Sequence, residues 1–197
     1  MSNTSATGGY ILPAPPGSVG NLSLQDFIQT VLVGVSALPG EMVRAKWQLN
    51  PPKQPDICVD WLSFGITEDD SDTFAYDTIQ PDNSYILQRM EALTVQCTFA
   101  GPNALEYAKL VRDNFQIGPN REALQSVGMD FVSTSRITRV PDLVNERWRD
   151  RWEMSVYLRR EILRTYPVLY FVSAAGTLYA LASPPATEIP INVTEGT

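Results

Sequence analysis

The sequence predicts an α+β fold in which a mostly antiparallel sheet carries helices packed on one face. Runs of alternating apolar and polar residues, typical of half-buried strands, follow one another through short or acidic connections. Only two long segments show the spacing of an amphipathic helix, which is too few for the crossovers of a parallel sheet. Strands that are close in sequence and joined in this way favour antiparallel pairing.

The first helix is expected over about residues 23–37. Ser23 stands three residues before Asp26, the spacing of a capping box, and Pro39 and Gly40 end the pattern. Apolar residues recur at helical spacing over a wide arc, so this helix is expected to belong to the core. These residues are Leu24, Phe27, Ile28, Val31, Leu32, Val35 and Leu38.

The strands of the first half are expected on either side of a proline-rich stretch. Short strands are predicted over residues 42–49 and 57–66, because the prolines of residues 50–55 forbid a regular ladder between them. The acidic residues 67–83 are expected to form an exposed loop or a twisted edge excursion. Residues 85–100 alternate with a period of two and predict a long half-buried strand.

The second half continues with a helix over about residues 103–115, ended by Gly118 and Pro119, and a short helical turn at residues 121–126. Strands are expected over residues 129–140 and 152–158, with a loop at 141–146 between them. After Pro167 only short apolar runs occur, and this tail is expected to fold against a partner.

The domain organisation follows from these patterns. A flexible arm rich in Gly, Ser, Thr and Pro is expected at residues 1–20, one domain at residues 21–166 and a C-terminal extension at residues 167–197. A chain of 197 residues suits one domain with a sizeable core better than two. Neither a secretory signal nor an apolar run long enough for a bilayer is found, so a protein made in the cytoplasm is expected.

The composition argues against several classes of function. The sequence has no histidine, which excludes Ser-His-Asp and Cys-His nucleophiles and the usual zinc and non-haem iron sites. No phosphate-binding glycine loop is present, and a net charge of −7 argues against a surface that wraps nucleic acid. We therefore expect no catalytic residues, no cofactor and no metal. Cys58 and Cys97 lie in strand-like runs and are expected to be buried free thiols, with a disulfide as the alternative.

Three weaker motifs have ordinary explanations. The acidic residues 68–72 lack the glycine and terminal glutamate of an EF-hand loop, so a solvated loop or an acidic contact surface is favoured over a calcium site. Asp60 and Glu91 form a carboxylate pair of the kind that any acidic domain offers by chance. Trp148 and Trp152 lie between arginines and allow stacking on single-stranded nucleic acid, but a strand with a buried aromatic face and an exposed arginine face is favoured.

The charges are distributed unevenly along the chain. Residues 60–91 hold eight acidic residues against one arginine, and residues 136–164 hold eight arginines against five acidic residues. Complementary patches at different places on one molecule are what a head-to-tail contact between copies requires, although two unrelated solvated surfaces explain the charges equally well. The candidate subunit interface consists of Glu68, Asp69, Asp70, Asp72, Arg147, Arg149 and Arg151. The two runs are expected to meet between neighbouring subunits, with a contact inside one subunit as the alternative.

Several segments resemble one family over about residues 20–166. They include Leu24 to Ile28, Leu38-Pro39-Gly40 with Val43, Arg44, Trp47 and Gln48, Pro55 to Trp61, Leu93 to Gln96, Phe99 to Gly101, Leu110 to Asp113, Asn120-Arg121, and Leu143 to Trp148 with Arg151. The chain is similar in these segments to the neck or tail terminator proteins of contractile-tailed bacteriophages. The N-terminal arm and the residues beyond Pro167 show no such similarity.

The resemblance implies a structural protein of the virion and no enzyme. It implies a ring, usually hexameric, that sits at the neck on the last ring of the tail tube, stops its polymerisation and joins the tail to the head connector. The implied partners are copies of the chain itself, the tail tube protein and the head-tail connector or adaptor proteins, with the sheath as a further candidate. DNA would pass through the lumen without specific binding, and assembly in the host cytoplasm is expected.

Other functions remain as alternatives. Another phage ring protein, either a head-completion protein or a tube subunit, would share these features. A nucleic-acid-binding accessory protein would use the arginines and tryptophans near residue 150, and an acidic hydrolase is the remaining enzyme hypothesis.

Overall fold

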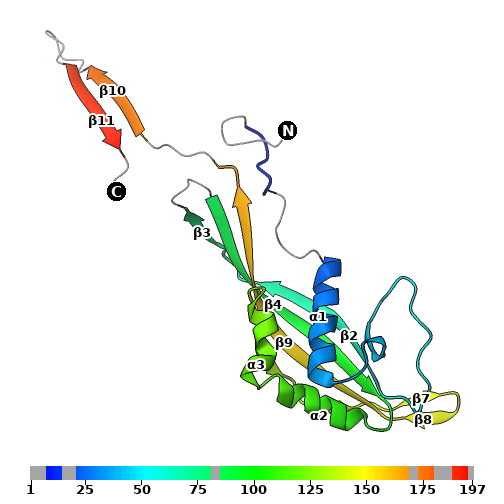
Figure 1. The fold of residues 1–197 in the computed structure, drawn as a ribbon. Helices are drawn as coiled ribbons and strands as arrows, with labels where there is room; N and C mark the ends of the chain where they lie inside the picture. Colours follow the sequence, from blue (N-terminus) through cyan, green and yellow to red (C-terminus); the bar gives the residue numbers. More distant parts are fainter. Residues whose placement is uncertain (1–7, 15–20, 81–84, 169–172, 180–187, 195–197) are drawn as a thin grey trace.

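The computed structural model describes residues 8–14, 21–80, 85–168, 173–179 and 188–194 (Figure 1). Its elements, in chain order, are α1 (Asn21–Ser36), a short 3-10 turn (Gly40–Met42), β1 (Val43–Ala45), β2 (Trp61–Ser71), β3 (Tyr76–Ile79), β4 (Tyr85–Ala100), α2 (Ala104–Asn114), α3 (Gly118–Gln125), β5 (Met129–Thr134), β6 (Thr138–Arg139), β7 (Asp142–Val144), β8 (Arg147–Arg149), β9 (Arg151–Tyr166), β10 (Ser173–Tyr179) and β11 (Glu188–Thr194).

The main sheet is built around the pairing of β4 with β9. These two strands of 16 residues are antiparallel and remain in register from Tyr85 opposite Tyr166 to Ala100 opposite Arg151. The strand order is β1-β2-β4-β9-β5, with β3 added to β4 and β6 added to β9. Every described pair is antiparallel except β1 with β2, which is parallel. The predicted α+β class is confirmed.

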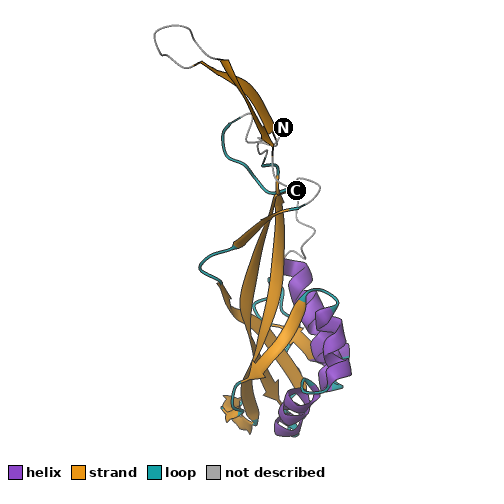
Figure 2. Cartoon of the chain, turned by 90° about the vertical axis from the view of Figure 1, so that its left-hand side faces the viewer, coloured by secondary structure: helices purple, strands orange, loops and turns teal. Residues whose placement is uncertain are grey.

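The helices lie together on one face of this sheet, as Figure 2 shows. Alternate residues of β4 point into the space between the sheet and the helices. Their side chains are at most 1% exposed, and they are Leu93, Val95, Cys97 and Phe99. The helix α1 contributes Ile28, Val31 and Leu32 to the same core, which confirms that it is a core helix. Phe115, at the end of α2, stacks on Phe131 of β5 with ring centroids 5.1 Å apart.

Beyond the helices, β3, β4 and β9 continue as a ribbon (Figures 1 and 2). Its residues 85–90 are half-buried on both faces because no helix covers them. The backbone N–H of Ala14 donates a hydrogen bond to the Thr165 carbonyl at the end of β9, 2.8 Å away. The strands β10 and β11 pair with each other as a hairpin. The rest of the expected arm, residues 1–7 and 15–20, and residues 169–172, 180–187 and 195–197 of the extension lie outside the described residues.

Several boundaries differ from the sequence prediction in the first half. The helix α1 begins at Asn21, so Ser23 is not its N-cap. The first strand is limited to Val43–Ala45, and residues 57–60 form a turn before β2. The acidic residues 68–71 are not in a loop, because β4 is long enough to pair with β2 as far as Ser71. A β-bulge between Ile66 and Glu68 shifts the register there by one residue.

The second half differs in its connections. Pro119 lies in the first turn of α3, where a missing N–H costs no helical hydrogen bond, so the Gly-Pro pair also begins a helix. The predicted strand 129–140 is divided into β5 and β6. The predicted loop 141–146 is wrong, since β7 and β8 form a hairpin there. Its turn residues Asn145 and Glu146 have φ of 48° and 62°, as in the tight turns that match the twist of paired strands.

The two cysteines lie in different environments. Cys97 is buried in β4, as predicted, whereas Cys58 is exposed in the turn before β2, so the prediction for Cys58 is wrong. Both thiols are free. Burial raises the pKa of the Cys97 thiol to about 12, so it stays protonated at neutral pH.

We therefore expect one of the two thiols to react with a thiol reagent at pH 8 in the folded protein and both to react in denaturant. A Cys58→Ser variant should lose the native reaction, because the thiolate is the reactive form and Cys97 is neither ionised nor exposed. Titration with a chromogenic disulfide reagent measures this. Rapid reaction of Cys97 in the folded Cys58→Ser protein would show that the β4 core is misplaced.

Candidate functional site

The face of the sheet that carries no helices is polar. The ladder places Thr98 of β4 between Ser63 of β2 and Glu153 of β9, and Gln96 between Gly65 and Ser155. These side chains alternate with the core residues of the same strands, so they all point away from the helices. Ser63 and Thr98 are only 9% and 8% exposed, so other parts of the chain cover this end of the open face.

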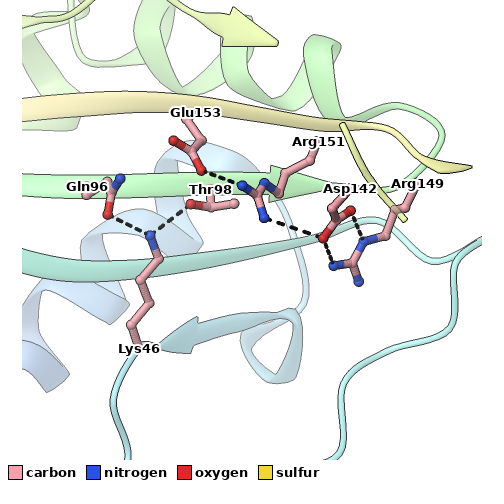
Figure 3. Close-up of polar contacts among 7 residues, drawn as sticks. All are labelled: Lys46, Gln96, Thr98, Asp142, Arg149, Arg151 and Glu153. Atoms are coloured by element: carbon pink, nitrogen blue, oxygen red, sulfur yellow. Dashed lines mark hydrogen bonds and ion pairs between the residues drawn. The ribbon is translucent and has the colours of Figure 1, made fainter. Parts of the chain in front are cut away.

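Lys46 reaches across this face from the end of β1 (Figure 3). Its ammonium donates hydrogen bonds to Gln96 Oε1 at 3.0 Å and to Thr98 Oγ1 at 2.8 Å. Burial lowers the pKa of Lys46, and the nearby Glu153 partly opposes this effect. A cation is therefore held against the middle of the sheet by neutral side chains.

The hairpin β7–β8 adds a second charged group at the edge of the open face. Arg149 is 4% exposed and forms a two-pronged pair with Asp142, with Nε–Oδ1 at 3.1 Å and Nη2–Oδ2 at 2.7 Å. Arg151 contacts Asp142 at 3.4 Å and Glu153 at 3.1 Å (Figure 3). The hydrogen bonds from Arg149 lower the pKa of Asp142. The Arg149–Asp142 pair joins the two strands of the hairpin, and the contact from Arg151 to Asp142 links the hairpin to β9.

A groove of about 460 Å³ adjoins these charges. It lies between the end of β1, the Trp61 ring of β2 and the proline-rich loop of residues 50–55, and we call it the tryptophan groove. Arg44 pins the loop, because its Nη1 donates to the Lys53 carbonyl at 2.7 Å. The guanidinium groups of Arg44 and Arg149 lie 6.0 and 5.8 Å from the Trp61 ring centre, within the range of cation–π contacts.

Trp47 forms the exposed wall of the tryptophan groove. Its φ of 57° is left-handed, which costs a residue with a side chain about 1–2 kcal/mol. The ring is 69% exposed and lies over Gly65, where an added Cβ would collide with it. The fold therefore supports a large aromatic side chain on the surface at some energetic cost.

The acidic residues of the candidate interface lie at the other end of β2. Glu68, Asp69, Asp70 and Asp72 are all exposed. Asp69 lies 3.6 Å from Arg160, which is bound more closely by Glu91 at 2.6 Å. Partial burial and then the Glu91 carboxylate raise the pKa of Asp69, while Arg160 acts in the opposite direction.

The acidic and arginine segments do not meet within one subunit. Asp69 is opposite Leu93 of β4, whereas Arg151 is opposite Ala100 at the end of that strand. The seven steps between them correspond to roughly 23 Å along the strand. Residues 68–72 therefore do not contact residues 147–151 within one subunit, although the wider runs do meet there, where Asp69 and Glu91 pair with Arg160.

The arginine segment is less free than the sequence indicated. Arg149 and Arg151 are bound by carboxylates of their own chain, and only Arg147 of the three is exposed. The sequence analysis favoured a strand with a buried aromatic face and an exposed arginine face, and this prediction is wrong for β8. There Trp148 is 71% exposed and Arg149 is buried, because Asp142 neutralises the arginine from the paired strand.

Several residues of this surface were missed by the sequence analysis. Lys46 and Asp142 carried no motif, and Trp47 was named only as part of the family resemblance. Lys46 and Trp47 depend on contacts with distant strands, whereas Asp142 binds an arginine seven residues away. Asp142 had one weak signal, since a carboxylate and an arginine flank a short Asn-Glu pair that can form a turn. The carboxylates of Asp60 and Glu91, named together in the sequence analysis, have separate structural partners, because Asp60 accepts hydrogen bonds from Asn103 and Glu91 pairs with Arg160.

The described residues offer no group of three or more His, Cys, Asp or Glu side chains suited to a metal ion. Within the same part of the chain, no helix has the length and apolarity needed to cross a membrane.

The sequence matches the model of a known protein family. The model of the family described as phage neck terminator protein matches residues 22–180. The chain belongs to this family. No curated protein matches the sequence significantly. The resemblance seen in the sequence is thus confirmed over more of the chain than it first covered.

Membership assigns a structural role at the phage neck, in contact with other tail and neck components. A protein of this kind works through its surfaces. The open face, the tryptophan groove and the acidic end of β2 are therefore candidate contact surfaces, because each combines exposure with an uncommon concentration of charge or aromatic side chains.

We expect Asp142→Asn to destabilise the protein by about 3 kcal/mol at pH 7, because it leaves the buried Arg149 without a counter-charge. The pKa of Asp142 is lower in the folded chain than in the unfolded one. Its contribution is therefore complete above about pH 4, the ordinary value for aspartate, and is lost as the pH falls through the lower folded value.

Urea unfolding at pH 7 and pH 3 measures both effects. The difference in stability between the native protein and Asp142→Asn should shrink at pH 3, with Asp130→Asn as an exposed control of the same chemistry. Equal stability of the native protein and Asp142→Asn at pH 7 would contradict the assignment of Arg149 as a buried, paired charge.

Proposed function

We propose that the chain forms a hexameric ring at the virion neck that caps the tail tube, stops its polymerisation and joins the tail to the head connector. The observation that supports this most directly is membership of the neck terminator family over residues 22–180. Ring formation needs two different surfaces on one subunit that fit each other, because a head-to-tail contact repeats until the rotation closes.

The distribution of charge supports such a contact. The exposed acidic side chains of β2 and the exposed Arg147 of β8 lie at opposite ends of the sheet in one subunit. We propose that Glu68, Asp69, Asp70 and Asp72 of one copy approach the hairpin of Arg147, Arg149 and Arg151 in the next. Arg149 and Arg151 contribute mainly by holding the hairpin, since their charges are already paired.

The other surfaces are assigned to the remaining partners. We propose that the tail tube protein and the connector or adaptor proteins bind the two faces of the ring, and that the sheath contacts its outside. Residues 1–20 and 167–197 act as arm and extension around a body of residues 21–166. DNA passes through the lumen without specific binding, since a chain of net charge −7 repels phosphate. The particle is assembled in the host cytoplasm.

Electron microscopy of the purified protein, alone and with tail tubes, tests the proposal. We expect closed rings of uniform size and rings seated on tube ends, with tube growth stopped. Long cylinders of this chain alone would identify a tube subunit instead. A protein that remains monomeric and leaves tube ends bare would remove the proposed function.

We expect Arg147→Glu to weaken ring formation about tenfold per interface, because a partly desolvated charge pair contributes about 1.5 kcal/mol or more. Combining it with Asp70→Lys should restore part of the affinity. Sedimentation as a function of protein concentration gives both values, and Arg136→Glu is the control for an exposed arginine outside the hairpin. A double variant no better than either single variant would show that these segments do not face each other.

A further inference from the structure

The tryptophan groove has the chemistry of a site for an extended, proline-containing peptide. It combines the exposed Trp47 ring, the Trp61 ring and the exposed Pro51 and Pro52 in a hollow of about 460 Å³. Aromatic-lined grooves bind polyproline segments because such segments are already extended and lose little entropy on docking. The shielded indole N–H of Trp61 has no hydrogen-bond partner in the described part of the chain, so the site also holds an unused donor.

The same chain carries a segment of the matching chemistry. Residues 11–16 read Ile-Leu-Pro-Ala-Pro-Pro, and no charged side chain occurs in residues 1–20. Proline fixes φ at values close to the polyproline conformation. Tyr10 and Leu12 are 92% and 65% exposed, so these two apolar side chains of the described part of the arm are left largely uncovered by their own subunit. One backbone hydrogen bond, from Ala14 to Thr165, links the described part of the arm to the sheet.

The arm and the groove lie at opposite ends of the molecule. Thr165 is fourteen positions from Arg151 along β9, which corresponds to about 46 Å of strand, and Arg151 adjoins Trp61 at the groove end. The arm joins α1 at Asn21, and α1 runs about 24 Å before the chain turns into β1 at the groove. The seven steps from Ala14 to Asn21 span at most about 24 Å, so Ala14 reaches the groove of its own subunit only if this segment runs fully extended along α1. The arm of another copy reaches the groove without this constraint.

We propose that the tryptophan groove receives residues 11–16 of a second copy of the chain, so that each subunit of the assembly is linked to the next by its arm. The proposal rests on the proposed ring and names a contact in it. This contact would explain the left-handed backbone of Trp47 and the absence of a side chain at Gly65, because together they present an aromatic wall to the incoming prolines. Because the arm is uncharged, this contact should change little with salt, unlike the charge contact between β2 and β8.

Engineered disulfides in the full chain test the proposal. In a Cys58→Ser background, Leu12→Cys is combined with Gln54→Cys, an exposed position on the groove wall. Mild oxidation should give a ladder of linked subunits on a denaturing gel. Adding Trp47→Asn, which tolerates the left-handed backbone but removes the indole, should reduce the ladder at least fivefold. Ile117→Asn, which removes an exposed apolar side chain at the N-cap of α3, outside both proposed contacts, should leave it unchanged.

Each other outcome overturns the proposal. An internal bridge between positions 12 and 54 would show that the arm occupies its own groove, and linkage of Leu12→Cys only to Thr165→Cys would place it on β9. Linkage of Asp70→Cys to Gln54→Cys without Leu12→Cys would make the acidic segment the occupant. No linkage in a protein that still sediments as a ring would exclude this contact alone, whereas a monomer would remove the proposed ring as well.

Discussion

The pairing of β4 with β9 over their whole length is the constraint on which the rest of the structure depends. It brings residues that are far apart in sequence into one continuous ladder, to which β2, β3, β5 and β6 are added. Because side chains alternate across a strand, this single register decides both what the helices cover and what the open face presents. Where the ladder extends past the helices, it forms a ribbon that no helix covers.

The two faces of the sheet have different tasks. Beneath the helices, apolar side chains form a core that stabilises the subunit by excluding water. On the open face, Lys46 and Asp142 hold polar strands and a hairpin in fixed positions through hydrogen bonds and ion pairs. A partner thus meets a rigid surface and needs little ordering when it binds, which reduces the entropic cost of association. This division is consistent with a structural protein of the phage neck.

The sequence was sufficient for the fold class, for the core helix α1 and for both bounds of β4, because these depend on local periodicity. It was insufficient where long-range pairing decides. Residues 68–71 look like an acidic loop, yet β4 offers them a partner strand. Arg149 looks like a surface arginine, yet Asp142 allows its burial. Trp47 had no signal as a groove residue, since its position depends on Gly65 of another strand.

The bulge between Ile66 and Glu68 decides on which face of the sheet each acidic side chain lies, and therefore which charged side chains are near it. The extra residue, Thr67, places Asp69 on the face of Arg160 and turns Glu68 and Asp70 to the opposite face. A regular ladder that kept Thr67 and left Ile66 opposite Val95 would place Glu68 opposite Leu93 and Asp70 opposite Glu91. Asp69 would then lie on the face away from Arg160, although the segment would contain the same charges. The distribution of charge between the two faces at this end of the molecule therefore depends on the register of β2 as much as on the residues that β2 contains.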